Sequence, residues 1–442
     1  MTADGSAFLT PFRLLTIVGL MGVSFAGGYF LSSSPEQEVV IADQATKTEE
    51  GRKRQTVTVL PLGPGVKVPR SSDEVFQMAG QIDRTAQLLL FYENLDPAQF
   101  AEEARKLEDL PWSDRIFASY LLFSQWGEED PQAAMAFADT MGFGGRFVKP
   151  TVLQSWAGDS PEQAAQYFID NPLEFRTGRR GDSAAAGVAK EWARQDPEAA
   201  LAWANGLEGD DKASAVRGVF GQLAQTDPGK ASEFLTQYPD LPDRGRLIET
   251  IGRNYGQSDF AAGEAWANNL TGEDRDRALS DVISGLAIND PELAGDKALA
   301  MAEGSFRDEA LGRTAQEFSR EYPEQALDFL LANASAEGQS RYVGEVISNL
   351  TRKNDQAARD FVLGQQGGAL RDEAAAYYVA SNTNSNFQAV LEIANSIQDE
   401  DRRRRSLGRA ARQGMVTSPE AARGFVENSE ELSDRQKRRL LN

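Results

Sequence analysis

From about residue 73 onward, apolar residues recur with a helical period, and short punctuation marks interrupt them at regular intervals. Most marks are an Asp, Ser or Tyr followed directly by Pro. Successive marks are 30 to 36 residues apart, with a mean near 32. The marks are Asp96-Pro97, Asp130-Pro131, Ser160-Pro161, Asp196-Pro197, Asp227-Pro228, Asp259-Phe260, Asp290-Pro291, Tyr322-Pro323, Asp355-Gln356, Asn386-Phe387 and Ser418-Pro419. So constant a period predicts a repeat protein built from one structural unit.

Each mark predicts the start of a helix. An Asp, Ser or Asn side chain accepts a hydrogen bond from the free backbone N–H groups of a first helical turn. Proline suits the first helical position because its missing N–H would have had no partner there. We therefore expect a helix of about ten residues after each mark, then a polar turn, then a longer helix. Examples of the turns are Gly206–Asp211 and Thr271–Asp274, and examples of the longer helices are Lys212–Gln225 and Arg275–Ala287.

Three positions around the marks predict the packing between helices. A small residue recurs four places after the mark, as Ala134, Ala164, Ala200, Ala231, Gly263, Ala294, Ala326 and Ala422. An aromatic residue recurs three places later, as Phe137, Tyr167, Trp203, Phe234, Trp266, Phe329 and Phe425. A large apolar residue recurs four places before the mark, as Trp126, Trp156, Trp192, Leu223, Tyr255, Leu286 and Phe318. Spacings of three and four residues place side chains on one helical face, so we expect a packed core, and Trp112 falls outside this pattern.

The resulting fold class is all-α. One hairpin of about 32 residues cannot bury its apolar face alone, whereas stacked copies can. We predict an α-solenoid of about ten to eleven antiparallel helical hairpins over residues 73–430, followed by a basic C-terminal tail at 431–442.

The repeat resembles the tetratricopeptide repeat. The run Ile248-x2-Ile251-Gly252-x2-Tyr255 is similar to the W-x2-L-G-x2-Y pattern of that family's first helix. The stretch Tyr322-Pro-Glu-Gln-Ala-Leu-Asp-Phe329 is similar to the start of its second helix. The likeness covers about residues 96–430, with a period nearer 32 than 34, and the units at Asp355 and Asn386 lack the aromatic residue. It implies a binding scaffold without catalytic activity.

The N-terminus contains the one membrane-like segment of the sequence. Leu14–Leu31 is 18 residues long and uncharged, close to the shortest helix that spans a bilayer. Arg13 precedes it and acidic residues follow, which places the N-terminus in the cytoplasm and the rest across the membrane. The alternative is a signal peptide cleaved near Ala26. We therefore assign 1–31 to a signal-anchor or signal peptide and 32–72 to a flexible, proline-containing linker. The solenoid is then extracytoplasmic, periplasmic in a bacterium, and soluble there if the segment is cleaved.

Composition excludes several function classes. The chain of 442 residues has no Cys and no His, so disulfides, thiolate or imidazole catalysis and Cys/His metal sites are ruled out. Its net charge is −21, which disfavours nucleic acid as a partner.

The remaining chemistry is that of carboxylates. Pairs such as Asp210/Asp211 are expected to be solvated residues at helix starts, where the helix dipole favours acids. The glycine-rich stretches Gly142–Gly145 and Gly364–Gly368 lack a phosphate-binding pattern. We predict no catalytic, cofactor-binding or metal-binding residues and no enzyme activity. A carboxylate-based hydrolase is the remote alternative.

Basic charge concentrates at the C-terminal end. Residues 401–442 carry a net +5, against −26 over residues 1–400. Four consecutive residues, Arg402, Arg403, Arg404 and Arg405, spread around a helix axis. They either pair with nearby acids in a polar terminal cap or contact an anionic polymer or a neighbour's acidic face.

The function expected from these features is that of a membrane-tethered scaffold. It would bind a protein or peptide partner through a solenoid surface. The alternative, from a different class, is a structural component of the cell envelope that assembles with copies of itself, with its basic end against acidic bodies.

Overall fold

The computed structural model describes residues 68–78, 80–142, 144–175, 183–382 and 386–441, all within the compact unit Pro61–Asn442. Every regular element among these residues is a helix and none is a strand, so the all-α prediction is confirmed for this part of the chain. The chain enters through α2 (Ser72–Phe76), α3 (Gln81–Glu93), the 3₁₀ turn Pro97–Gln99, α4 (Phe100–Lys106) and the 3₁₀ turn Leu107–Asp109.

Beyond these elements, odd-numbered helices of 10 to 18 residues alternate with even-numbered helices of 9 to 11. The odd-numbered helices are α5 (Trp112–Glu129), α7 (Gly145–Asp159), α9 (Ala184–Ala193), α11 (Gly209–Thr226), α13 (Arg244–Ser258), α15 (Gly272–Leu286), α17 (Ser305–Phe318), α19 (Ala336–Lys353), α21 (Ala369–Ser381) and α23 (Glu400–Thr417). The even-numbered helices are α6 (Pro131–Thr140), α8 (Pro161–Asp170), α10 (Pro197–Gly206), α12 (Pro228–Gln237), α14 (Phe260–Asn269), α16 (Pro291–Leu299), α18 (Pro323–Asn333), α20 (Asp355–Gly364), α22 (Phe387–Asn395) and α24 (Pro419–Asn428).

A single residue joins most odd-numbered helices to the even-numbered helix that follows. The N–H of Asp130 donates to the carbonyl of Trp126, which closes α5, while its carboxylate accepts a hydrogen bond of 3.0 Å from the N–H of Ala133 in α6. The same side-chain cap occurs at Asp196, Asp227, Asp259 and Asp290. The predicted helix starts are therefore confirmed at these marks, because one residue ends one helix and caps the next.

Four marks differ from the prediction. At Ser160 and Ser418 the next helix begins as predicted, but neither side chain makes a capping hydrogen bond. At Asp96-Pro97 the new segment begins as a 3₁₀ turn before α4 continues it. In the later unit the cap is Asn354, whose side chain accepts from Ala357, so the mark at Asp355 is wrong by one residue. Asn354 and Asp355 both have side chains that can cap a helix, so the sequence alone does not indicate which of the two is the cap. With Asn354 as the cap, the next two steps are both 32 residues and the expected small and aromatic residues are Ala358 and Phe361. This unit therefore keeps its aromatic residue.

The turns from even- to odd-numbered helices are shorter than expected. Helix α11 begins at Gly209 and α15 at Gly272, inside the segments predicted as turns. Both glycines have φ near +57°, a left-handed conformation that costs little without a Cβ. Asp210 and Asp211 consequently lie in the first helical turn, where the dipole favours negative charge.

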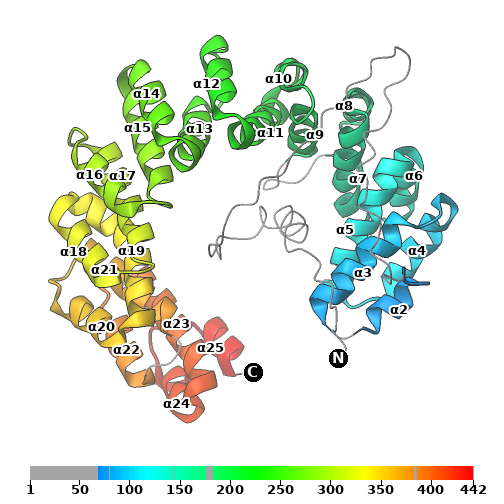
Figure 1. Cartoon of the computed structure of the whole chain (residues 1–442). Helices are drawn as coiled ribbons and strands as arrows, with labels where there is room; N and C mark the ends of the chain where they lie inside the picture. The colour runs from blue at the N-terminus through cyan, green and yellow to red at the C-terminus, as the bar shows by residue number, and fades with distance from the viewer. Residues whose placement is uncertain (1–67, 79, 143, 176–182, 383–385, 442) are drawn as a thin grey trace, which may run out of the picture. The chain divides into compact units, whose positions relative to one another are not determined.

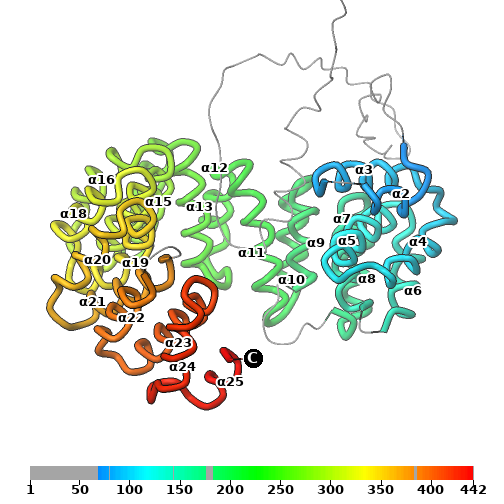
Figure 2. The backbone as a smooth tube through the Cα atoms, turned by 90° about the horizontal axis from the view of Figure 1, so that it is seen from below, coloured from blue at the N-terminus to red at the C-terminus, as the bar shows by residue number. Residues whose placement is uncertain are grey.

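The helices form two layers. Each odd-numbered helix from α5 to α21 packs along the next odd-numbered helix, and each even-numbered helix packs against the odd-numbered helices before and after it. The even-numbered helices consequently lie on one side of the row of odd-numbered helices (Figure 1, Figure 2).

Hydrogen bonds between like ends show that neighbouring odd-numbered helices run parallel. At the C-terminal ends of α13 and α15, the side-chain amide of Asn289 donates to the carbonyl of Gln257 at 2.9 Å. At the N-terminal ends of another pair, α21 and α23, the backbone N–H of Asp399 donates to the carboxylate of Asp372 at 2.8 Å. Each repeat therefore rests on the previous one in the same orientation.

The core follows the three predicted positions. Ala200, Ala231 and Ala326 are fully buried, and the aromatic residues four places before the cap pack, with tilted rings, against those seven places after it. The ring centroids are 5.3 Å apart for Trp126–Phe137, 5.4 Å for Trp156–Tyr167, 6.0 Å for Trp192–Trp203 and 5.6 Å for Tyr255–Trp266. Phe329 is partly buried against the same core.

Glycine permits a close helix contact between α13 and α15. An ideal Cβ on Gly256 would lie 2.0 Å from the carbonyl oxygen of Val282, and one on Gly285 would lie 2.3 Å from that of Arg253. Since each glycine faces backbone of the other helix, the two axes approach more closely than any side chain would allow.

The predicted termini have different outcomes. The signal segment 1–31 and linker residues 32–67 lie outside the described residues. Among the residues that are described, no helix is both long and apolar enough to cross a membrane. The segment predicted as a C-terminal tail contains α25 (Asp434–Leu441), which packs against α23 and α24.

Candidate functional site

Two adjoining cavities lie along three consecutive turns between even- and odd-numbered helices. A cavity of about 440 Å³ lies between the α14–α15 turn and the α16–α17 turn. A second, of about 600 Å³, lies between the α16–α17 turn and the α18–α19 turn. Both are lined by Glu303, Gly304, Ser305 and Arg307, so we treat them as one feature and call it the Ser305 groove.

Apolar and charged side chains together line the smaller half of the Ser305 groove. Leu279 and Ile283 of α15 face it from one side, and Met301 and Phe306 from the other. On the rim, Lys297 forms an ion pair of 2.7 Å with Glu264 and lies 4.9 Å from the ring centre of Phe260. This half therefore offers both apolar contact and charged groups to a ligand.

The larger half is polar, and hydrogen bonds fix its base. Asp308 accepts the backbone N–H of Ser335 at 2.9 Å and also the Ser335 hydroxyl. The hydroxyl oxygen in turn accepts the N–H of Gly338, which caps α19. Arg341 pairs with Glu337 at 2.6 Å on the exposed side. Because the carboxylate of Asp308 holds two consecutive turns together, this half presents its backbone and amide groups in a fixed arrangement.

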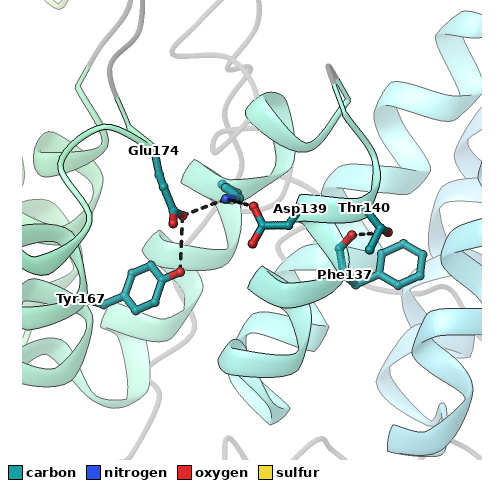
Figure 3. A network of polar contacts seen from close by, with 6 residues as sticks. Phe137, Asp139, Thr140, Tyr167 and Glu174 are labelled. Carbon is teal, nitrogen blue, oxygen red and sulfur yellow. Dashed lines mark hydrogen bonds and ion pairs between the residues drawn. The ribbon is translucent and has the colours of Figure 1, made fainter.

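A buried lysine forms a separate polar cluster. Lys149, on α7, forms ion pairs of 2.5 Å with Asp139 and 2.8 Å with Glu174, and the hydroxyl of Tyr167 donates to Glu174 at 3.3 Å. Figure 3 shows Asp139, Glu174 and Tyr167 converging in this way. Burial alone would lower the pKa of Lys149, but hydrogen bonds to both acids outweigh it and hold the pKa above its usual value. The ammonium stays charged and joins α6, α7 and the segment after α8.

This cluster fits a structural role best. A charged lysine is a poor nucleophile or base, and the adjoining cavity, lined also by Leu173 and Arg146, is only about 240 Å³. We expect Lys149→Met to lower the free energy of unfolding by roughly 1–3 kcal/mol, since it leaves two carboxylates facing each other without a counter-charge. Chemical denaturation would measure the loss. Arg146→Met, an exposed change in the same cavity, should stay near wild type, and an equal loss in both variants would contradict the role of the buried pair.

The predicted basic contact is largely paired with acids of the chain itself. Arg402 forms an ion pair with Glu373, Arg403 with Glu431 at 3.1 Å, and Arg404 with Asp401 at 3.7 Å. Arg405 has no ion pair within the described residues. The alanine repeat positions are fully buried, the aromatic ones are buried or half-buried, and none of them lines the Ser305 groove.

Carboxylates of unusual pKa lie away from the cavities. Burial raises the pKa of Asp281 to about 8, and burial also raises the pKa of Glu317. Neither side chain lines the Ser305 groove or the Lys149 cavity. Within the described residues there is also no group of three or more acids able to hold a metal ion.

Neither the groove nor the lysine cluster was identified from the sequence. The groove depends on residues 300–304, which separate α16 from α17 without a helical pattern. Lys149 occupies a position that is apolar in most other repeats, and this departure is the signal that would have indicated it. Asp139 and Glu174 lie 10 and 25 residues from Lys149, so no local motif links the three.

Comparison with known proteins gives no further assignment: no protein-family model, curated protein or solved structure matches this chain.

Proposed function

We propose that the chain is a membrane-tethered α-solenoid of ten to eleven tetratricopeptide-like hairpins, and that it binds a segment of a protein partner in the Ser305 groove. The observation that carries this proposal is the continuity of the two cavities across three repeats. An extended peptide advances about 3.3 Å per residue, so several of its residues fit along such a groove.

The lining of the groove favours a peptide over a small molecule. Leu279, Ile283, Met301 and Phe306 offer apolar contact for one or two side chains, while Asn333 and Arg307 offer hydrogen bonds to a backbone. Methionine adapts its shape to different side chains and is common at such binding surfaces. No covalent step is needed, which agrees with a scaffold that carries neither a cofactor nor catalytic residues.

The tether and its direction are further parts of the proposal. The uncharged segment Leu14–Leu31, with Arg13 before it, supports a cytoplasmic N-terminus and an extracytoplasmic solenoid. Cleavage near Ala26 would leave the solenoid soluble in the same compartment.

Photo-crosslinking tests the groove directly. The full chain is expressed in its native cells with a photoreactive amino acid in place of Ser305. In the control, the photoreactive amino acid replaces Leu293, which is exposed on α16 outside the groove. We expect crosslinks from position 305 to one segment of another protein, and none to that segment from position 293.

The substitution Met301→Glu, combined with the crosslinker at 305, should reduce capture of that segment at least tenfold because it places a charge on the apolar wall. Leu293→Glu should leave capture unchanged. Crosslinks only between copies of the chain would favour the self-assembling envelope component instead, and the absence of a specific product would overturn the proposal.

A further inference from the structure

Four arginines lie along one face of α23. Arg402, Arg405, Arg409 and Arg412 are separated by three, four and three residues, which is the spacing of a single helical stripe. The four consecutive arginines do not form this stripe, because Arg403 and Arg404 point toward other partners, Glu431 and Asp401.

Most of the stripe has no counter-charge. Arg402 pairs with Glu373 of α21. Within the described residues, Arg405, Arg409 and Arg412 form neither an ion pair nor a hydrogen bond, and all three are exposed. A chain of net charge −21 thus carries a row of unpaired guanidinium groups in one place.

The stripe borders a groove between α21 and α23. Its volume is about 370 Å³, and Arg402, Arg405, Ser406 and Arg409 line one wall. The opposite wall consists of Glu373, Ala376, Tyr377 and Ala380. We call this feature the arginine groove.

The opposite wall is shaped for close approach of a chain. Two alanines leave its surface low, and Tyr377, which is 41% exposed, presents an aromatic face. The ring of Tyr377 is seated against Gly344, where any Cβ would lie 2.5 Å from it, so the ring is fixed in position. The groove therefore combines guanidinium donors on one side with a rigid, mostly apolar surface on the other.

Guanidinium groups at this spacing match carboxylates on an extended chain. Arg405 and Arg409 are about 6 Å apart along the helix axis at 1.5 Å per residue. Side chains on one face of an extended peptide recur every second residue, which is about 6.6 Å. Arginine binds carboxylates through paired hydrogen bonds, and these are stronger than contacts between neutral groups.

We propose that the arginine groove binds an extended acidic segment of a protein, with carboxylates at alternate residues. This surface is distinct from the Ser305 groove, and the inference does not depend on the partner bound there. A protein segment is favoured over a nucleic acid because the overall negative charge of the chain repels a long polyanion with a phosphate on every nucleotide. A short acidic peptide contacts only the local positive stripe.

Fluorescence anisotropy with the full chain in detergent tests this. The probes are a fluorescein-labelled peptide with glutamate at alternate positions and a matched peptide with glutamine in their place. We expect the glutamate peptide to bind at least tenfold more tightly, with affinity falling as salt increases.

Paired variants separate the groove from general charge. Arg405→Gln with Arg409→Gln should weaken binding of the glutamate peptide at least tenfold. Arg435→Gln with Arg438→Gln, two exposed residues of α25, removes the same charge elsewhere and should change affinity less than twofold. Circular dichroism checks that both variants remain helical.

Several results would overturn the inference. These are equal weakening by both double variants, no preference for glutamate over glutamine, or equally tight binding of inorganic phosphate or of phosphatidylglycerol vesicles at the same groove. Concentration-dependent dimerisation that the Arg405/Arg409 variant abolishes would identify a second copy as the occupant and would also overturn it.

Discussion

Gly256→Ala should destabilise the protein by about 2–4 kcal/mol, one of the two largest effects expected for a single substitution. The added methyl group would lie 2.0 Å from the carbonyl oxygen of Val282 and 2.8 Å from the Cα of Gly285. Both are backbone atoms, so no side-chain rotation relieves the contact. Helices α13 and α15 must separate, which loosens the apolar layer between them. Urea unfolding followed by tryptophan fluorescence measures the change, since Trp266 lies in the intervening α14.

A second glycine provides the matched control. Gly221 lies inside α11, and nothing lies within 4 Å of its ideal Cβ. Gly221→Ala should be neutral or should stabilise by up to about 1 kcal/mol, because alanine loses less backbone entropy in a helix. If Gly256→Ala behaved like Gly221→Ala, the close contact between α13 and α15 would be incorrect.

Asp281→Asn should stabilise the protein at neutral pH, which is unusual for a buried substitution. Asp281 lies on α15 and is only 4% exposed. Burial, and then the charges of Glu309 and Glu249, raise its pKa to about 8, against the opposing effect of Arg253 and Arg277. The folded protein therefore holds this carboxyl in its neutral form near pH 7, whereas the unfolded chain ionises it.

The pH window follows from the two pKa values. Below the unfolded value of 3.8 the carboxyl is neutral in both states and costs nothing. Between this pH and about pH 8, the folded protein binds a proton that the unfolded chain has lost. The free energy of unfolding therefore falls by about 1.4 kcal/mol for each pH unit in this range. Asparagine has the shape of the neutral acid and avoids this cost. The expected gain is about 4 kcal/mol at pH 7, falling toward zero near pH 4.

Urea midpoints of wild type and variant between pH 4 and pH 8 test this expectation. Asp276→Asn, an exposed residue of the same helix, makes the same change in net charge and should show little pH-dependent difference. A gain for Asp281→Asn that did not vary with pH would show that packing, and not protonation, is responsible.

The architecture could be predicted because its signals are local. Each cap acts on backbone N–H groups within three residues, and each small–aromatic pair lies on one helical turn. Such interactions require particular residue types at fixed spacings, and these spacings recur in the sequence with each structural repeat. The displacement at Asn354 shows the limit of this reasoning, since two adjacent residues have equally suitable side chains and the structure uses the first of them, which places Ala358 at the buried position.

The candidate sites could not be predicted because their residues come from different repeats. Lys149 meets Glu174 only because the segment after α8 returns to α7. The stripe on α23 is visible as a spacing in the sequence, but its freedom from counter-charge depends on which acids the neighbouring helices bring near. Glu373 reaches Arg402, and among the residues that the structure describes no acid forms an ion pair with Arg405.

Capping, spacing and repeat length were enough to specify an all-helical chain of about 32-residue units, since short-range hydrogen bonds and helical periodicity act before any distant contact forms. The distance between helices, the protonation of Asp281 and the position of the grooves were decided by tertiary packing. These properties depend on what neighbouring repeats place within a few ångströms, and electrostatic and steric energies change steeply over that range.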